Sequence, residues 1–429
     1  MQENALRLVA VVCALALIGC SSGSNISRLS KQIETQTDLA SSDMVDIRRE
    51  IHSHPDLANK ESRTAELVAR TLRSYGLEVR TNVGGYGVVG ILKCGKKGPV
   101  VAYRSDMDAL PMDIRENVAY RSTVPGVAHA CGHDVHTTLG LGIARVLSTL
   151  RDELPGTVVF IFQPAEETIE GAKRMIQAGV LDDPRLDAIF AVHVVPVEVG
   201  RIVTNPGVGL PGVEDFTIRL KGSGDLNSAA DHLMQAIRST GNVRFPEGFE
   251  EWQKYFGYWL QKNSVLSSFV LSMAWKERVG EKEIVLKGFL KASGEPEYSK
   301  AKERIRTELS QLKNGVHGEL ESEKKLPDMF CDEKLANWSV QPLARMIGDS
   351  SVIVAPNSFP FFGEDFAYFL QELPGAMFFL GASNREKGIV ALPHSPGFQI
   401  DETAIPIGIK AMSGVLVNYL LSPPKSAAR

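Results

Sequence analysis

The sequence predicts an α/β fold: a catalytic domain with a mostly parallel central sheet, interrupted by a smaller inserted α+β lid domain. In the first and last parts of the chain, short continuous apolar runs alternate with helical patterns, which is typical of strands covered on both faces. Between residues 213 and 326 the chain carries more charge and fewer such runs, as a smaller separate domain would. The length of 429 residues also exceeds that of one typical domain.

Residues 1–20 differ from the rest of the chain. The apolar run Leu8–Ile18 is too short to span a bilayer and suits a secretory signal peptide. It ends in Leu17–Cys20 (LIGC), which resembles the lipobox at which bacterial lipoproteins are cleaved and acylated on cysteine. We therefore expect a lipoprotein-type signal peptide over residues 1–20, a polar tether over 21–42, and an exported, lipid-anchored protein that faces the periplasm. An uncleaved membrane anchor is the alternative.

The catalytic domain is expected over residues 43–212 and 327–425. Helices are predicted from Asp43 to His52 and from Ser62 to Tyr75. The strand-like runs are Val88–Leu92, Val100–Tyr103, Val158–Phe162, Ala188–Val192 and Met377–Leu380. Polar clusters that contain Asp106, Glu166 and His193 directly follow three of these runs. Because the working crevice of an open α/β sheet lies beyond the carboxyl ends of its strands, one site could collect all three clusters.

The lid domain is expected over residues 213–326. Strand-like runs occur at Phe216–Leu220, Phe269–Ala274 and Glu283–Leu290, and an amphipathic helix is predicted over Glu297–Leu312. Within this region the segment from Ser239 to Leu266 is rich in aromatic residues: Trp252, Tyr255, Phe256, Tyr258 and Trp259. Such spacing is more typical of the core of a helix than of a ligand pocket.

Composition excludes some functions. Hydrophobic content of 44%, charged content of 23% and a net charge of -4 argue against a nucleic-acid partner. If Cys13 and Cys20 belong to the leader, Cys94, Cys131 and Cys331 remain, and three cysteines do not make a disulfide framework. At least one thiol is left over, and Cys131 is the candidate for a metal-bound thiolate.

The stretch His129–His136 (HACGHDVH) concentrates metal-binding residue types. Cys131 and His133 lie two residues apart, so their side chains can converge on one point. Glu166 and Glu167 are adjacent at a strand end, where one can bind a metal while its neighbour faces the metal-bound water. Taken singly, His129 and His136 would more often be core or loop histidines, His193 a structural histidine, and the glutamate pair part of a solvated loop. Their conjunction, together with His394 in a proline-flanked loop, predicts a metal pair held by thiolate, imidazole and carboxylate.

The residues resemble the M20 metallopeptidases, and within them the amidohydrolase branch of aminoacylases, hippurate hydrolases and auxin-conjugate hydrolases. The matching stretches are Ile47–Pro55 (IRREIHSHP), Tyr103–Met112 (YRSDMDALPM), His129–His136, Phe162–Glu167 (FQPAEE), Gly363–Phe366 (GEDF) and His394–Phe398 (HSPGF). The resemblance implies two divalent ions, zinc or manganese, bound by Cys131, His133, Glu167, His193 and His394. It further implies Glu166 as general base and proton shuttle, and an orienting role for Asp106 that His136 and Asp134 could share.

The lid departs from the family pattern. Members of this branch usually carry a Gly-Gly-His stretch early in the lid, whose histidine helps to bind the substrate carboxylate or the oxyanion. Here Lys221–Asp225 takes its place, with Asp225 where the histidine is expected, and Lys291 stands where an arginine is common. An acid there would repel a substrate carboxylate, which leaves substrate preference open. The aromatic segment between Ser239 and Leu266 has no counterpart in the family pattern, and a cover for an apolar acyl group is its alternative interpretation.

The resulting hypothesis is a metal-dependent amidohydrolase that cleaves the amide of N-acyl amino acids or similar small conjugates by metal-activated water, with Glu166 as general base. One alternative is a metallo-carboxypeptidase or dipeptidase acting on small peptides. Another is a non-catalytic metal-binding protein with an altered lid. A monomer and a homodimer both remain open, and membrane contact is expected only through the lipid anchor.

Overall fold

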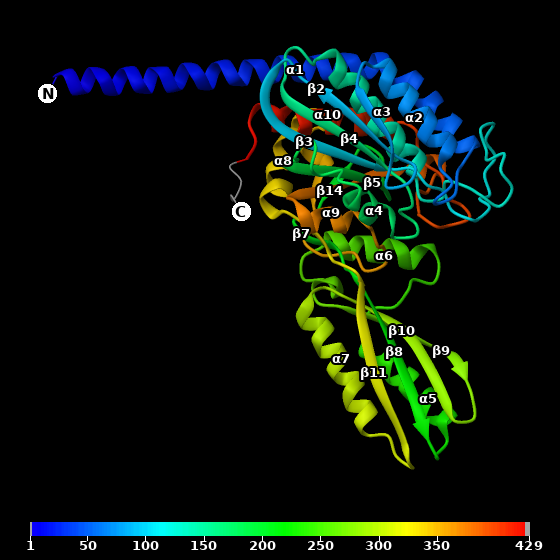
Figure 1. Ribbon diagram of the computed structural model, residues 1–429. Coiled ribbons are helices and arrows are strands. Elements are labelled where there is room, and N and C mark those ends of the chain that lie inside the picture. The colour runs from blue at the N-terminus through cyan, green and yellow to red at the C-terminus, as the bar shows by residue number, and fades with distance from the viewer. Residues whose placement is uncertain (1, 425–429) are drawn as a thin grey trace.

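The computed structural model describes the backbone of residues 2–424 and the side chains of residues 24–424. Its larger domain is built on an eight-stranded sheet in the order β1-β2-β4-β3-β5-β14-β6-β13 (Figure 1). These strands are β1 (Glu78–Val83), β2 (Gly87–Lys93), β3 (Lys96–Asp106), β4 (Pro155–Gln163), β5 (Ala188–Glu198), β6 (Ile202–Thr204), β13 (Val352–Val354) and β14 (Gly375–Ser383). The central strands β4, β3, β5 and β14 are parallel, whereas β1, β2 and β6 join by antiparallel pairing. The predicted fold class is therefore confirmed.

Helices cover both faces of this sheet, which explains why its strands read as continuous apolar runs. The helices are α1 (Gln2–Ser53), α2 (Ser62–Ser74), α3 (His133–Thr149), α4 (Gly171–Gln177), α8 (Glu333–Ile347), α9 (Phe366–Glu372) and α10 (Ala404–Leu421), with short 3-10 turns η2 (Asp349–Ser351) and η3 (Arg385–Lys387). Helices α1, α3 and α10 pack against one another, and α4 packs against α9. Helix α10 is apolar enough to cross a membrane, but most of it is buried inside the fold, as expected of a helix that is apolar all round.

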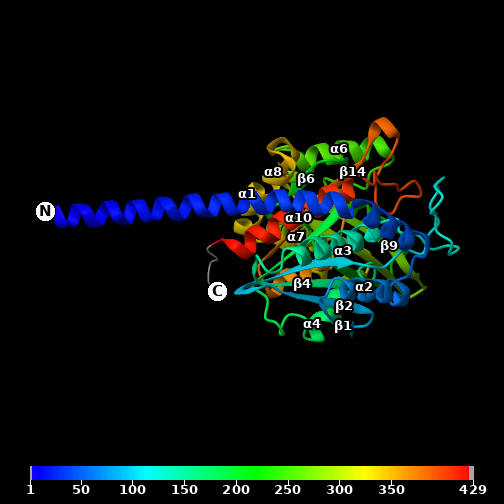
Figure 2. The same cartoon turned by 90° about the horizontal axis from the view of Figure 1, so that it is seen from above.

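Helix α1 is longer than expected, and it corrects the predicted tether. We predicted a helix from Asp43 and a polar tether over residues 21–42, but one helix runs from Gln2 to Ser53 (Figure 2). Leu29, Ile33 and Ala40 are fully buried in the main core. The polar composition was misleading because a helix needs only one apolar stripe to pack on a domain. The side chains of residues 1–23 lie outside the described residues, so the signal peptide remains a prediction.

The smaller domain is an antiparallel sheet with helices on it, and it extends away from the main sheet in Figure 1. Its strand order is β11-β8-β10-β9, from β8 (Val213–Gly222), β9 (Val270–Val279), β10 (Glu283–Ala292) and β11 (Val316–Leu326). Helices α5 (Leu226–Thr240) and α7 (Glu295–Ser310) pack on this sheet and bury a separate apolar core. The short pair β7 (Gly207–Leu210) and β12 (Met329–Cys331) lies where the chain enters and leaves this domain.

The aromatic segment does not stay with the lid, which differs from the predicted continuous insertion over residues 213–326. Helix α6 (Phe249–Leu260) and the turn η1 (Val265–Ser267) return to the larger domain, where Phe256 and Trp259 join the main core. The indole N–H of Trp259 donates to Asn205 Oδ1 at 2.9 Å, between β6 and β7 of the larger domain. The chain therefore leaves the lid after α5, packs on the catalytic domain, and re-enters the lid at β9.

Candidate metal centre

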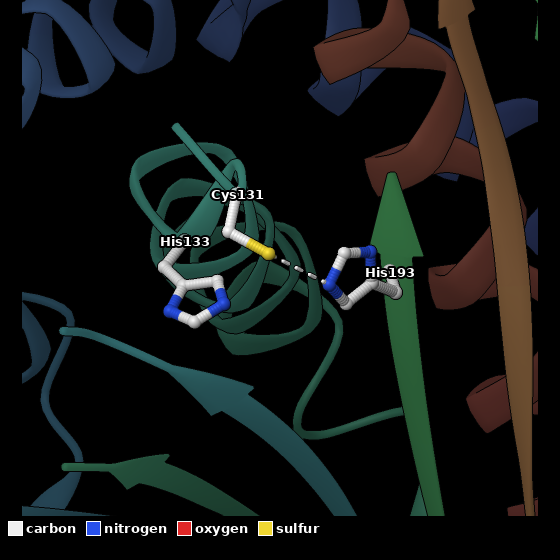
Figure 3. Close-up of side chains that lie close together, drawn as sticks. All are labelled: Cys131, His133 and His193. Carbon is white, nitrogen blue, oxygen red and sulfur yellow. Dashed lines mark hydrogen bonds between the residues drawn. The ribbon is translucent and has the colours of Figure 1, made fainter. Parts of the chain in front are cut away.

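The stretch around Cys131 turns sharply before helix α3 begins. Gly132 has φ of +91°, and a Cβ there would lie 2.3 Å from Val194 Cγ2, so only glycine fits the position. This turn brings Cys131 and His133 to the same side, as the spacing predicted. His193 joins them from β5, with its Nε2 3.4 Å from Cys131 Sγ (Figure 3). His193 lies within β5 rather than after it, because that strand continues to Glu198.

The glutamate pair reaches the same point from the loop after β4. His133 Nε2 lies 3.8 Å from Glu167 Oε1 and 3.8 Å from Glu166 Oε2. His394, on the loop between β14 and α10, places its Nε2 3.3 Å from Glu167 Oε2. The structure therefore brings together all of the residues predicted to bind metal, and the prospective ligand atoms within each of several overlapping trios lie within 4.8 Å of one another.

The burial and the protonation of the prospective ligand atoms favour the binding of cations. His133 Nε2 and Glu167 Oε1 are buried and have no hydrogen-bond partner, an arrangement that costs free energy unless something satisfies them. Burial raises the pKa of the Cys131 thiol, and neighbouring carboxylates raise it further, so its thiolate needs a nearby cation. Burial keeps the pKa of His193 well below its usual value, so this imidazole stays neutral. Thiolate, neutral imidazole and carboxylate are the ligands that zinc and similar divalent ions take.

Hydrogen bonds fix which ring nitrogen of each histidine faces the site. His133 Nδ1 lies 3.2 Å from Asp108 Oδ1, and His193 Nδ1 donates to the Val194 carbonyl at 2.7 Å. Both rings therefore carry a proton on Nδ1 and turn Nε2 inward. Burial alone would lower the pKa of His133, but the carboxylates of Asp106 and Asp108 raise it to about 10, so a metal ion would displace a proton from its Nε2. Asp108 also accepts the backbone N–H of Glu167 at 2.9 Å, so one carboxylate supports two prospective ligands.

Asp106 and His136 form a pair beside the ligands. His136 Nδ1 lies 2.7 Å from Asp106 Oδ1, and its Nε2 accepts the N–H of Val194 at 2.9 Å, so both ring nitrogens are in use. Asp106 thus holds His136 against β5, while Asp108 holds the ligand imidazole. Sequence reasoning had singled out Asp106 and missed Asp108. Asp108 lies two residues beyond the end of β3, in a loop whose conformation periodicity does not predict.

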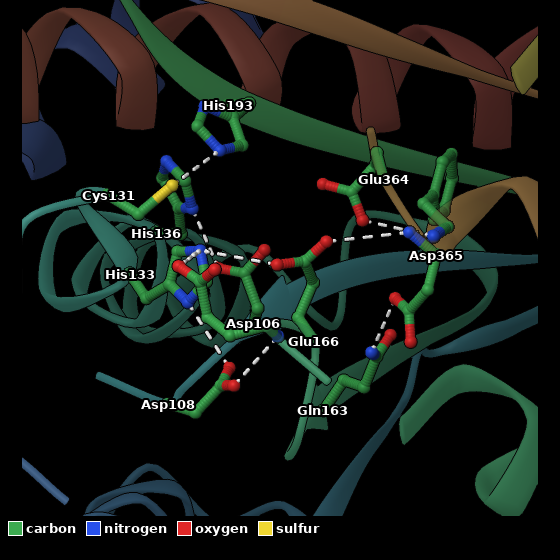
Figure 4. Close-up of polar contacts among 12 residues, drawn as sticks. Asp106, Asp108, Cys131, His133, His136, Gln163, Glu166, His193, Glu364 and Asp365 are labelled. Atoms are coloured by element: carbon green, nitrogen blue, oxygen red, sulfur yellow. Dashed lines mark hydrogen bonds and ion pairs between the residues drawn. The ribbon is translucent and has the colours of Figure 1, made fainter. Parts of the chain in front are cut away.

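Glu166 lies beside Glu364 and Asp365 (Figure 4), two carboxylates that belong to a buried ion-pair network. Arg104 binds Asp106 at 2.6 Å, Glu364 at 2.9 Å and Asp365 at 3.0 Å, and its side chain is fully buried. Glu166 Oε1 accepts a hydrogen bond from the backbone N–H of Asp365, with 3.5 Å between the nitrogen and the oxygen. Burial raises the pKa of Glu166 well above its usual value, and the negative charges of Glu364 and Glu167 add to that effect. A carboxylate whose pKa is raised in this way accepts a proton more readily than an ordinary glutamate, as a general base must.

A second network ties helix α1 to the ligand loop. Asp134, next to His133, binds Arg48 at 2.7 Å and His52 at 2.8 Å, and His52 also contacts Glu116 at 2.9 Å. Burial alone would lower the pKa of His52, but these two carboxylates raise it. His129, by contrast, is buried with no partner for either nitrogen, and burial lowers its pKa to about 3. Its ring therefore stays neutral and is not part of the ligand set.

The lid residues that departed from the family pattern lie outside the ligand cluster. Asp225 caps helix α5 by accepting the backbone N–H groups of Asn227 and Ser228 at 3.0 and 3.1 Å. Lys291 is buried and donates to the Phe362 carbonyl, and burial lowers its pKa to about 7. Neither lines the cavity of about 500 Å³ that opens over Cys131, Glu166, Glu167, His193 and His394.

Convergent metal ligands in a pocket, with an extra carboxylate of raised pKa beside them, define a metal-dependent hydrolase. Residues 102–418 match Peptidase family M20/M25/M40, and the chain belongs to that family. It is 32% identical to IAA-amino acid hydrolase ILR1-like 4 of Arabidopsis thaliana, over 88% of this chain and 86% of that protein. It is also 32% identical to Thermostable carboxypeptidase 1 of Saccharolobus solfataricus, over 88% of this chain and 95% of that protein.

A solved structure extends the comparison. The Bacillus subtilis YXEP protein, described as a dinuclear metal binding peptidase from the M20 family, superposes with a TM-score of 0.73. The two chains are 27% identical, and the match covers 90% of this chain and 99% of that one.

Proposed function

We propose that the protein is an amidohydrolase that cleaves the amide bond of N-acyl amino acids or similar small conjugates. The observation that carries the proposal is the position of Glu166, which lines the same pocket as the prospective ligands and adds a carboxylate to five other side chains that offer donor atoms. A site that only stored metal would not require a carboxylate of raised pKa there.

The site residues have two kinds of role: five would bind metal ions, and one transfers a proton. Cys131, His133, His193, Glu167 and His394 would hold two divalent ions, zinc or manganese. When bound, these ions would supply electrostatic stabilisation of the amide carbonyl and of the attacking oxygen. Glu166 takes a proton from the attacking water as the new carbon–oxygen bond forms, and it delivers that proton to the nitrogen as the carbon–nitrogen bond breaks. Asp108 keeps His133 in the tautomer that binds metal.

A metallo-carboxypeptidase or dipeptidase is the second candidate. The similarity to a protein named as a carboxypeptidase favours it, at the same identity as the similarity to the conjugate hydrolase. The two candidates share one site and one mechanism and differ only in whether the group on the carbonyl side is an acyl group or an amino acid. A non-catalytic metal-binding protein is disfavoured by the presence of Glu166.

The deciding experiment is free-amine release from a panel of N-acyl amino acids and unacylated dipeptides. The protein is loaded separately with zinc and manganese, and Glu166→Ala serves as the blank. Release from acylated substrates that requires both metal and Glu166 supports the amidohydrolase, and release from dipeptides alone favours the second candidate. No release from any substrate, with metal bound, would leave the non-catalytic alternative.

We also propose that the protein is exported and anchored through lipid on Cys20, either as a monomer or as a homodimer. The LIGC stretch after an apolar run supports the anchor. Metabolic labelling with a fatty acid, compared with a Cys20→Ala variant, tests it: label that is retained in the variant would contradict acylation at this residue.

A further inference from the structure

Aromatic rings make up part of the pocket lining. They are Phe245, Trp252, Phe361 and Phe362, which we call the aromatic wall. They share the pocket with the proton carrier Glu166 and with His394. A group of the substrate that lies beside the scissile amide can therefore reach these rings.

The aromatic wall is packed before any ligand binds. The ring of Trp252 lies 5.2 Å from that of Phe361 in an edge-to-face arrangement and 6.0 Å from that of Phe362 in a stacked one. Phe245 lies 5.6 Å from Phe361. Behind these rings, Phe256 stacks on Phe359 at 4.6 Å. Because the rings hold one another in place, little ordering is needed when a ligand binds.

The segment between the two lid passages supplies half of this wall. Phe245 and Trp252 come from the segment between α5 and β9; Trp252 packs against the main core, whereas the ring of Phe245 lies 5.6 Å from Phe361 and 6.3 Å from Phe289 of the lid strand β10. Asn357 fixes the end of α6 by donating to the carbonyls of Tyr258 and Gln261, each at 2.8 Å. The ring of Phe245 remains 41% exposed at the pocket, although it is large and apolar. A ligand that covers it would gain hydrophobic free energy.

Charge decides which part of the substrate lies on the aromatic wall. The carboxylates in the lining are Glu166 and Glu167, and among the described residues that line the pocket there is no lysine or arginine. Against the rings, the carboxylate of an amino acid would lose its hydration with no lysine or arginine of the lining to pair with it. The acyl group is uncharged, so its burial against the rings desolvates no charge.

We propose that the aromatic wall binds the acyl group and makes the protein selective for bulky, flat apolar acyl groups, such as phenylacetyl or benzoyl, over acetyl. This inference rests on the proposed amidohydrolase function. A pocket of about 500 Å³ is large enough for such a group together with an amino acid.

The test compares kcat/KM for N-phenylacetyl-alanine and N-acetyl-alanine in the full chain loaded with metal. Phe245→Ala is the main variant, because a partly exposed ring can be removed with little effect on folding, and Trp252→Ala is the second. Phe249→Ala is the matched control, since Phe249 lies on α6 with Trp252, is 44% exposed, much as Phe245 is, and does not line the pocket. Calorimetric binding of both compounds to Glu166→Ala gives a readout that does not depend on turnover.

We expect the wild-type protein to favour the phenylacetyl substrate roughly tenfold or more, and each wall variant to lower that ratio by roughly tenfold, the effect of losing about one aromatic pair. The Phe249→Ala ratio should match that of the wild type. Equal kcat/KM for both substrates, or a ratio that Phe245→Ala and Trp252→Ala leave unchanged, would overturn the inference while the amidohydrolase survives. If nothing is hydrolysed, the proposed function fails, and calorimetry alone tests whether the aromatic wall binds the acyl group. Tighter binding of the phenylacetyl compound than of the acetyl compound would support that inference, and equal binding would overturn it.

Discussion

Replacing Asp108 with Asn tests how the site orients its ligands. Asp108 uses one oxygen for His133 Nδ1 at 3.2 Å and the other for the N–H of Glu167 at 2.9 Å. Asparagine has nearly the same shape but only one acceptor oxygen, so its amide N–H must face one of these two donors. One prospective ligand then loses its support, whichever way the amide is turned.

The expected cost follows from this geometry. Loss of a hydrogen-bonding partner behind a metal ligand weakens metal affinity by roughly 10- to 100-fold, which corresponds to about 1.4 to 2.7 kcal/mol. Because Asp108 is only 1% exposed, water cannot readily replace the lost bond, and we expect the upper half of that range.

The assay is zinc affinity measured by competition with a chromophoric chelator, with thermal unfolding as a check on folding. Asp113→Asn is the matched control, because Asp113 lies on the same segment but accepts only the N–H of Gly126, away from the ligands. Zinc affinity of Asp108→Asn equal to that of the control would refute the claim that Asp108 sets the tautomer of His133.

Further predictions concern single residues. Cys131→Ala should lower the bound metal per chain, measured by atomic emission, and unchanged stoichiometry would remove Cys131 from the ligand set. Gly132→Ala should destabilise the fold by about 1–3 kcal/mol in urea unfolding, because φ is positive and Val194 blocks the Cβ; an unchanged midpoint would contradict this. Lys291 has a pKa of about 7 when folded, so above pH 7 the unfolded chain binds more protons and stability rises with pH, by up to about 1.4 kcal/mol per unit. Lys291→Met should remove that rise between pH 7 and 9, and an equal rise in both proteins would count against a buried neutral lysine.

Much of the site could be predicted because its chemistry is concentrated in short stretches at strand ends. Cys131, Glu167 and His394 come together as the residue types and the sheet edge implied. The choice between Asp106 and Asp108 could not be made, since Asp106 ends β3, Asp108 lies in the loop beyond it, and only the packing of α3 decides which one hydrogen-bonds to His133.

The parts that sequence reasoning missed depend on long-range packing. Residues 21–42 look polar, and the partner of their narrow apolar stripe, the surface of α3 and α10, is distant in sequence. The aromatic segment was expected to be either helix core or pocket, and α6 is both: Phe256 and Trp259 enter the core, whereas Trp252 lines the pocket. Periodicity alone does not show which apolar side chains of a helix enter the core and which line a pocket.

The return of residues 241–269 to the catalytic domain also bears on motion. An ordinary insertion is joined to its host by two chain segments, which can bend together as a hinge. This lid is joined by two more, one leading from α5 to α6 and one leading from η1 into β9. Rotation of the lid must strain all of these connections, so its swing should be narrow. Trp252 packs against the catalytic core and should stay with the prospective ligands, whereas Phe245 touches both Phe361 and Phe289 of the lid and marks where the pocket would change if the lid moved.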